Sequence, residues 1–237
     1  MPYQEETIKT IGDRLRLLLA AGHKSRFPML KELFSETVGG NPHLEVERAW
    51  MFETGFDLAG VPMAGFDVRV RLFANLIENM IEKYRSSYAN VGRALGTGVE
   101  VEVRWAPLAF MEASVGYRYL FARDLVDDLP LDFRTPHRLV LGIRFLTRAG
   151  FTAGLEVLCA SGQRSVYFDT LTAEWVNDEL PPHVLVNGRL RYELQAGPAV
   201  GLYVFMDGRN PLDASYVSGS FEPRPGREVV IGLGVEL

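Results

Sequence analysis

The sequence predicts an all-β protein: an antiparallel meander of about ten strands that forms part of a transmembrane β-barrel, either partial or small and closed. Three observations predict it. Apolar and polar residues alternate along many segments, tight turns alternate with long polar connections, and several segments exceed the roughly 9 to 11 residues that cross a bilayer as a strand. No linker, low-complexity run or fixed-period repeat divides residues 1–237, so we expect one domain.

Composition and charge exclude several classes of protein. The chain carries 25 Lys and Arg against 30 Asp and Glu, a formal net charge of −5, whereas nucleic-acid-binding proteins normally have a basic surplus. No apolar run approaches the roughly 18 to 20 residues of a membrane-spanning helix. Cys159 is the only cysteine, which excludes an internal disulfide and a cysteine-based zinc site. The first residues lack the basic and apolar regions of a secretory signal, so we expect none in the chain as written.

Strict alternation marks the individual strands, because successive side chains of a strand point to opposite faces. From Val99 to Trp105 the odd positions are valine or tryptophan and the even positions glutamate or arginine. Similar alternation runs from Met111 to Phe121, from Val184 to Leu194 and from Val229 to the C-terminus. The expected strands, in order, lie near 13–24, 47–59, 64–82, 88–105, 108–122, 137–147, 150–162, 183–195, 198–208 and 227–237.

The connections between these strands alternate in length. The tight turns are Gly60–Met63, Ala106–Pro107, Arg148–Ala149 and Ala196–Gly197, and the longer connections are 25–46, 123–136, 163–182 and 209–226, with a shorter one at 83–87. A short helix is expected within Phe27–Glu36. Outer-membrane barrels have short periplasmic turns and long extracellular loops, so we expect the long connections outside and the C-terminus in the periplasm.

Alternation alone does not decide which face meets lipid, because a soluble lipocalin-like barrel alternates with its apolar set inside. Strand length favours the membrane barrel, and so do aromatic residues toward strand ends, as in interfacial girdles: Trp105, Tyr117, Tyr119, Tyr192 and Tyr203. The residues expected to face lipid are Val101, Val103, Val115, Leu141, Ile143 and Leu190. Those expected to face the lumen are Glu102, Arg104, Arg118, Arg144 and Arg189.

Six stretches match short motifs in a fixed order. They are 26–34 (R-x-P-x-L-x-E-L-F), 40–47 (G-N-P-x-L-x-x-E), 53–55 (E-x-G), 88–100 (Y-x-N-x-G, then G-x-E), 135–137 (T-P-H) and 210–227 (N-x-L-D-x-x-Y, then P-G-R). The residues that carry them are Arg26, Pro28, Asn41, Pro42, Glu47, Glu53, Asn90, Gly92, Gly98, Glu100, Pro136, His137, Asn210, Asp213, Tyr216, Pro225, Gly226 and Arg227.

Together these stretches resemble the C-terminal part of the barrel of TonB-dependent outer-membrane receptors, over nearly the whole chain. Val46 and Pro211 depart from the usual proline and leucine, and Leu237 stands where phenylalanine is usual. Barrels of such transporters have 22 strands around a plug, so the resemblance implies that residues 1–237 are a fragment without plug domain, TonB-contacting segment or earlier strands.

The resemblance also implies a function. The full-length parent is expected in the outer membrane of a Gram-negative cell, where it takes up a siderophore, cobalamin or a similar scarce ligand. Its expected partners are outer-membrane lipid, the barrel-assembly machinery, a plug domain and TonB, with no nucleic acid.

Few residues of the sequence suggest a catalytic or metal-binding site. No Ser-His-Asp order, phosphate-binding loop or paired-carboxylate motif is present, so we expect no enzyme and no cofactor or metal. The histidines, at 23, 43, 137 and 183, are expected at strand rims without metal-ligand spacing. The acidic connection with Asp124, Asp127, Asp128 and Asp132 is expected to be a solvated surface, and Cys159 to fill the apolar face.

Charged and motif residues have structural interpretations. Arg69, Arg71, Arg104, Arg118, Arg144, Arg189 and Arg191 share the expected inner face with Glu100, Glu102, Glu112 and Glu193. Neutralisation across neighbouring strands is a simpler account of them than attraction of an anionic siderophore. The motif residues are interpreted as structural: Pro-Gly-Arg as a turn, and Asn210 and Asp213 as side chains that bond their own backbone where a strand ends.

Two other functions stay open at this point. One is a small closed outer-membrane pore that works without plug or partner, which ion conductance by the chain alone would favour. The other is a barrel-type ligand carrier or hydrolase, which the absence of a catalytic constellation disfavours.

Overall fold

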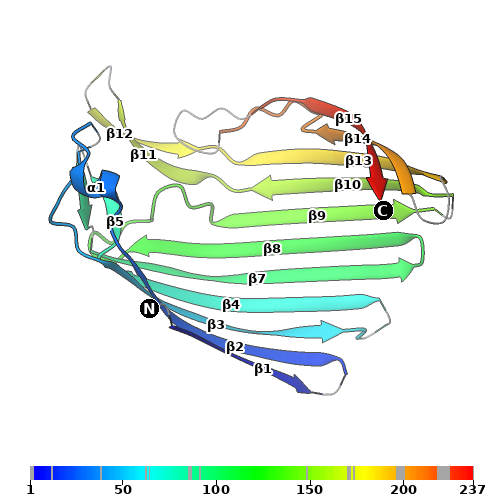
Figure 1. Cartoon of the computed structure of the whole chain (residues 1–237), viewed down its shortest axis with the longest axis horizontal. Coiled ribbons are helices and arrows are strands. Elements are labelled where there is room, and N and C mark those ends of the chain that lie inside the picture. The colour runs from blue at the N-terminus through cyan, green and yellow to red at the C-terminus, as the bar shows by residue number, and fades with distance from the viewer. Residues whose placement is uncertain are drawn as a thin grey trace.

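In a computed structural model, one antiparallel sheet of eleven strands makes up most of the protein (Figure 1). In sheet order the strands are β1 (Tyr3–Ile11), β2 (Leu15–Arg26), β3 (Glu47–Ala59), β4 (Phe66–Glu78), β7 (Arg93–Leu108), β8 (Met111–Asp124), β9 (His137–Leu146), β10 (Phe151–Ala160), β13 (His183–Gln195), β14 (Gly201–Arg209) and β15 (Glu228–Glu236). Two hairpins stand apart from this sheet, β5 (Ile81–Tyr84) with β6 (Ser87–Asn90) and β11 (Gln163–Asp169) with β12 (Glu174–Leu180). The structure describes residues 3–11, 13–37, 39–61, 63, 65–84, 87–90, 92–147, 149–169, 172, 174–195, 201–217 and 225–236.

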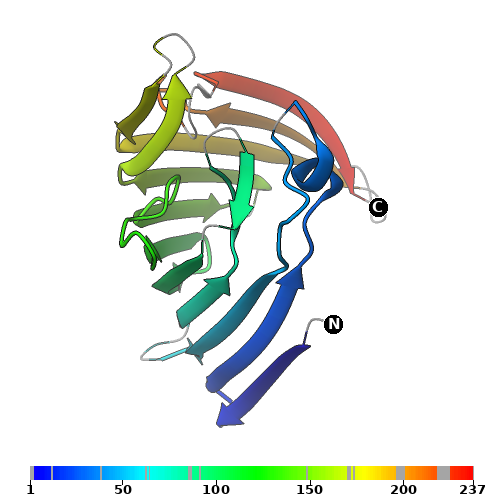
Figure 2. The same ribbon diagram turned by 90° about the vertical axis from the view of Figure 1, so that its left-hand side faces the viewer.

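The sheet is an open arc. Each strand pairs with its neighbours in the sheet order, and within the described residues β1 and β15 pair on one side only. Figure 2 shows the arc from the end that carries α1 (Leu30–Phe34), with α1 and the β5–β6 hairpin lying on its concave side. The all-β prediction and the partial barrel are thus confirmed.

The register places the apolar and polar residues on opposite faces. Val103 of β7 pairs with Val115 of β8, which pairs with Leu141 of β9, so these side chains share one face. Glu102, one residue from Val103, lies on the other face. We call the first the apolar face and the second, which lines the hollow of the arc, the concave wall. All the residues predicted for each face lie together as expected.

The apolar face is not covered by protein. Leu19, Ile231 and Leu233 are 63%, 76% and 81% exposed, and among the described residues only Met80, Ile81, Ala94 and Leu180 are buried hydrophobic residues. A water-soluble domain of this size would bury a core, so the apolar side chains are arranged for an apolar surrounding. No helix among the described residues is long and apolar enough to cross a membrane.

One predicted aromatic position is wrong. Tyr203 pairs with Glu193 and Gly234 on the concave wall, where the Arg191 guanidinium carbon lies 3.8 Å from the centre of its ring. The other four aromatic residues lie on the apolar face as predicted. Tyr203 follows apolar Leu202 and precedes Val204, so local alternation gave no indication of its face.

The two ends of the sheet differ as predicted. The turn end, where β2 follows β1 and β4 follows β3, carries short connections, and the loop end carries α1 and both hairpins (Figure 1). The first turn after β7 lies at Ala109–Phe110 rather than at Ala106–Pro107, because β7 continues through an irregularity between Trp105 and Leu108. The predicted turn at Ala196–Gly197, the start of the strand at 198–208, and Leu237 lie outside the described residues.

Five elements differ from the sequence prediction. β1 was not predicted, because Thr7 and Lys9 put polar side chains on the face where its neighbour β2 has Leu19 and Leu17. The strand expected at 64–82 stops at Glu78, since Asn79 has a positive φ of 54° and turns the chain into β5. The strand expected at 88–105 divides likewise into β6 and β7, and the connection 163–182 contains the β11–β12 hairpin. The predicted helix is shorter, at Leu30–Phe34.

Candidate functional site

Motif residues of the first long connection converge on Arg26, at the end of β2. Its guanidinium donates to the carboxylates of Glu32 in α1 at 3.0 Å and of Glu47 in β3 at 3.3 Å, and to the carbonyl oxygen of Ile81 at 3.5 Å. Glu32 is only 4% exposed and also accepts the Met29 N–H at 2.8 Å. Arg26 therefore joins the helix, the β3 strand and the β5–β6 hairpin.

Two motif asparagines extend this junction. The Asn41 amide donates to the carbonyl of Tyr88 at 3.0 Å. Asn90 accepts the Glu45 N–H at 2.8 Å and donates to the carbonyl of Asn79 at 2.7 Å. We call the hydrogen-bonded set of Arg26, Glu32, Glu47, Asn41 and Asn90 the loop junction. It holds the first long connection and the β5–β6 hairpin together on the concave side of the arc.

A second group of motif residues lies between β14 and β15. Asn210, 4% exposed, donates its amide to the Ala214 carbonyl at 2.8 Å and accepts the Ala214 N–H at 2.9 Å. Asp213 accepts the Arg227 N–H and guanidinium, each at 3.0 Å. These hydrogen bonds hold the pKa of Asp213 below its usual range. Gly226 lies beside the same carboxylate, because a Cβ there would come within 2.5 Å of the Asp213 Oδ1.

The remaining motif residues occupy the sheet or its rim. Gly98 lies beneath the Phe73 ring, so a side chain there would collide with it. Glu53 pairs with Arg71 at 3.5 Å on the concave wall, and Glu100 shares that wall. The His137 ring, on the apolar face, has its Nδ1 2.8 Å from the Tyr117 hydroxyl. The motif residues thus form several groups rather than one site.

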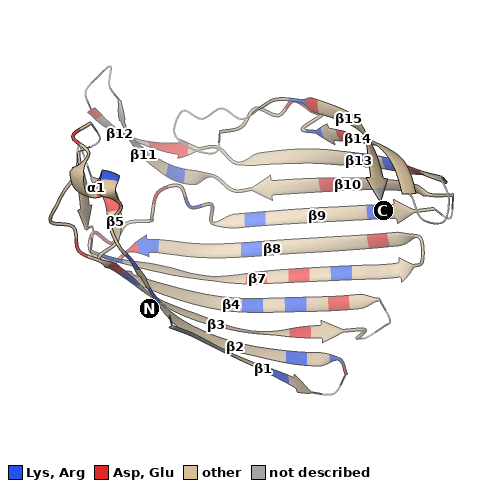
Figure 3. Cartoon of the chain, in the orientation of Figure 1, with Lys and Arg blue, Asp and Glu red and all other residues tan. Residues whose placement is uncertain are grey.

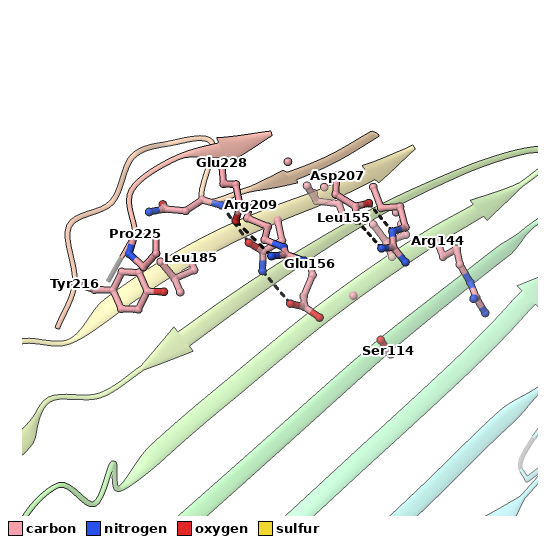
Figure 4. Close-up of a pocket in the computed structure, with 18 of the residues that line it drawn as sticks. Ser114, Arg144, Leu155, Glu156, Leu185, Asp207, Arg209, Tyr216, Pro225 and Glu228 are labelled. Atoms are coloured by element: carbon pink, nitrogen blue, oxygen red, sulfur yellow. Dashed lines mark hydrogen bonds and ion pairs between the residues drawn. The ribbon is translucent and has the colours of Figure 1, made fainter. Parts of the chain in front are cut away.

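A hollow lies on the concave wall, between β8 and β15. Its volume is about 730 Å³. Its lining includes Ser114, with a small side chain, and Gly142 and Gly154, which have none, on three neighbouring strands. Tyr216 and Pro225 lie at one side (Figure 4). This hollow is the candidate functional site because it combines space with charged side chains.

The charged residues of the hollow neutralise one another. Arg144 pairs with Glu112 at 2.9 Å, Arg189 with Asp207 at 2.5 Å, and Arg209 with Glu228 at 3.3 Å. The Glu156 carboxylate accepts the Asn187 amide at 3.1 Å (Figure 4). Asn187 in turn accepts the N–H of Asn210 at 3.2 Å, which joins the hollow to the second motif group. The site is polar without a surplus of positive charge.

Neutralisation extends along the wall toward β3 (Figure 3). Arg69 pairs with Asp57 at 3.3 Å and with Glu102 at 3.0 Å, and Arg71 pairs with Asp57 at 2.6 Å. Arg104 lies 3.8 Å from Glu112, and Arg191 lies 3.3 Å from Glu193. The predicted neutralisation across neighbouring strands therefore accounts for five of the seven arginines considered in the sequence. Arg191 pairs within its own strand, and Arg118 forms no ion pair with the described residues.

The acidic connection is partly neutralised and partly buried. Asp128 pairs with Arg123 at 2.6 Å, and Asp132 with Arg164 at 3.4 Å. Burial raises the pKa of Asp132 although Arg164 opposes the shift, and burial likewise raises the pKa of Glu82 in β5. Within the part of the chain that the structure describes, no group of three or more His, Cys, Asp or Glu side chains is placed to hold a metal ion.

The four histidines do not form one cluster. His23 contacts Trp50 on the apolar face, with ring centres 4.6 Å apart, and His183 stacks on Tyr216 at 5.0 Å. The N–H of His43 donates to Asn41, and Cys159 lies on the apolar face opposite Val184. His137, His183 and Cys159 nevertheless line one smaller pocket together with Ser161.

Comparison with solved structures shows the same fold. The ferric enterobactin receptor PfeA of Pseudomonas aeruginosa, in a variant form, is 15% identical with a TM-score of 0.76 over 99% of this chain and 40% of its own. The ferripyoverdine receptor of the outer membrane of Pseudomonas aeruginosa is 15% identical with a TM-score of 0.72, over 97% and 32%. The FrpB iron transporter of Neisseria meningitidis is 13% identical with a TM-score of 0.73, over 98% and 38%.

This chain therefore spans less than half of the length of each of these proteins. No curated protein matches its sequence. A family model described as "TonB dependent receptor-like, beta-barrel" matches residues 8–207, from within β1 to within β14. The chain belongs to the TonB-dependent receptor β-barrel family.

Proposed function

We propose that the chain is the C-terminal part of the barrel of an outer-membrane receptor that takes up a siderophore, cobalamin or a similar scarce ligand. The observation that carries this proposal is the open eleven-stranded arc with an exposed apolar face and a charged concave wall. An exposed apolar face outside and a polar interior are the arrangement of transmembrane barrels. The family of the chain, and the iron-related receptors with the same fold, support the function.

The directions of the two edge strands support an incomplete barrel. Neighbours in the eleven-stranded sheet are antiparallel throughout, so the first and last strands, β1 and β15, run the same way. Direct closure of β1 on β15 would pair them in parallel. Bacterial single-chain barrels have even numbers of antiparallel strands. An antiparallel closure here requires an odd number of further strands, which a longer receptor supplies and a self-closing pore does not.

The proposal carries the partners and orientation expected for such a receptor. The apolar face meets outer-membrane lipid after insertion by the barrel-assembly machinery, the concave wall faces a plug domain, and TonB couples uptake to energy. The loop end is extracellular and the turn end periplasmic. The family, one of receptors, supports transport rather than an enzymatic role.

The DNA upstream of the Met1 codon tests the incomplete barrel. We expect an in-frame sequence that encodes an odd number of alternating strands and, before them, a plug segment. A non-coding upstream region, together with uniform ion conductance by the chain alone in planar bilayers, would favour the small closed pore instead.

Epitope tags in the full-length parent test the orientation. A tag at Asp128, in the connection between β8 and β9, should bind antibody on intact cells. A tag at Ala109, in the turn between β7 and β8, should bind only after the outer membrane is opened. Accessibility of Ala109 but not Asp128 on intact cells would reverse the orientation.

A further inference from the structure

Two arginines lie directly opposite each other on the concave wall. Arg118 of β8 and Arg138 of β9 are register partners in the antiparallel pairing of the two strands. Side chains of directly opposite residues begin only about 4.5–5.5 Å apart at Cβ, and like charges in that arrangement destabilise a sheet.

Neighbouring residues do not neutralise this pair. Neither arginine forms an ion pair with any of the described residues, whereas Arg144, six residues beyond Arg138 on the same face of β9, pairs with Glu112. Arg118 also has its Nε buried without a hydrogen-bond acceptor. A buried donor without an acceptor costs free energy, so the pair is poorly satisfied in the chain alone.

One nearby glutamate, Glu100, can neutralise at most one of the two arginines. Glu100 lies opposite Arg118 on the β7 side and forms no ion pair with the described residues, so its side chain is available to Arg118. On its other side Arg138 has Ala160, followed on the next strand by His183. The diagonal neighbours of Arg138 on this wall bear no carboxylate: Gly116, Leu120 and Leu158. At least one guanidinium therefore keeps its charge uncompensated.

We propose that Arg118 and Arg138 together bind an oxyanion group, a carboxylate or phosphate, of a small ligand that enters the hollow of the arc. A planar guanidinium donates two parallel hydrogen bonds to such a group, and a second guanidinium opposite it supplies the remaining donors. Arg138 is exposed on the wall and Arg118 is half-buried beside it, so the anion approaches from the hollow. This inference rests on the proposed receptor function, because it places a ligand contact on the receptor wall.

Titration of the 237-residue chain with inorganic phosphate tests the site. The chain is held in detergent micelles at constant ionic strength, and binding is followed by calorimetry. Saturable phosphate binding is expected, and Arg138→Gln should weaken it at least about tenfold because one of the two charged donors is lost. The matched control is Arg69→Gln, which removes the same charge from the same wall at a site already paired with Asp57 and Glu102. The control should change the dissociation constant less than about twofold.

A second measurement does not require the ligand. Without phosphate, Arg138→Gln should raise the urea midpoint of unfolding because it removes the repulsion, and Arg69→Gln should lower it. Phosphate that fails to saturate the wild-type chain, or an equal loss of binding in both variants, would overturn the site. So would a lowered urea midpoint for Arg138→Gln. Phosphate binding by the chain would support the anion site even if the upstream DNA proved non-coding, a result that would refute the proposed receptor function. The failure of the site and the failure of the receptor function are therefore distinguishable.

Discussion

At the scale of single residues, the polar motif side chains satisfy backbone groups where the chain leaves the sheet. Asn210 bonds the backbone of Ala214, four residues on, as its type and position predict. Asp213 bonds Arg227 across the connection instead of its own local backbone. The sequence indicates which residue types bond backbone at a strand exit, but the partner of Asp213 depends on where the chain returns.

The pair of Asp213 and Arg227 should give the β14–β15 connection a dependence on pH. The pKa of Asp213 lies below its usual range because the ionised form accepts hydrogen bonds from Arg227. The stabilisation is therefore fully present above the unfolded-state pKa and is lost as the pH falls through the folded-state pKa. Carbon NMR titration of the Asp213 carboxyl should show the lowered pKa. Arg227→Gln keeps the backbone N–H donor but removes the guanidinium, so it should raise this pKa part of the way toward the ordinary value. An unchanged pKa in that variant would contradict the pairing.

Arg26 should control the stability of the loop junction. Arg26→Gln leaves the carboxylate of Glu32, which is 4% exposed, without its cation. We expect a local loss of about 1–3 kcal/mol, measured by hydrogen exchange of the Gly40 and Asn41 amides, which bond the carbonyls of Ser35 and Glu32.

The control for Arg26 is Arg48→Gln, which removes the same charge from an exposed position on β3. It should leave the exchange rates of the two amides unchanged. Equal acceleration in both variants would show that the effect is one of overall charge rather than of the junction.

At the scale of elements, alternation predicted strands where one face is apolar and missed them where it is not. β8 and β13 were found because their apolar residues recur at every second position. Alternation does not predict β1, because this edge strand carries Thr7 and Lys9 on the face that is apolar in β2. The β11–β12 hairpin lies outside the main sheet and has no apolar stripe to mark it.

The two faces of β7 should differ in their tolerance of charge. Val103 lies on the apolar face and Glu102 on the concave wall. If Val103 lies near the bilayer midplane, Val103→Arg should cost about 2–4 kcal/mol in unfolding from lipid bilayers. Glu102→Gln should cost little, because it removes only an exposed ion pair with Arg69. Equal tolerance at both positions would contradict a membrane-facing apolar surface.

Parts of the candidate site cannot be predicted from the alternation of apolar and polar residues within single strands. The inner-face arginines and glutamates follow from parity within each strand, and most of them do pair with one another. The pairing of positions 118 and 138 depends on the register between β8 and β9, which a 12-residue connection separates. The lining of the hollow likewise includes small residues on three strands, Ser114, Gly142 and Gly154, that only the register brings together.

At the scale of the whole molecule, the open sheet limits what the chain can do alone. The first strand expected from the sequence, near 13–24, is not an edge strand, because β1 lies outside it. The last expected strand, near 227–237, corresponds to the other edge, β15. Each edge presents N–H and C=O groups that lipid cannot satisfy. An edge of this kind favours pairing with further strands, so we expect the completed barrel rather than the arc to be the transporting form.

The chain alone should therefore fail to transport. We expect it to be oligomeric or poorly soluble without detergent, and unable to restore uptake to cells that lack the parent receptor. Radiolabelled ligand accumulation, with and without an uncoupler, measures this. Energy-dependent accumulation by cells that express only these residues would contradict the incomplete barrel.

Disulfide trapping tests the open arc most directly. In a Cys159→Ser background, cysteines replace Thr7, Lys9 or Ile11 of β1 in combination with Val229, Ile231, Leu233 or Val235 of β15, all on the apolar face. A disulfide requires Cα atoms within about 7 Å. The control pair, Leu19→Cys with Thr54→Cys, joins register partners of β2 and β3 and should form a disulfide in micelles. We predict that no edge pair forms a disulfide within a monomer; an efficient intramolecular disulfide between β1 and β15 would show a closed eleven-stranded barrel and contradict the account.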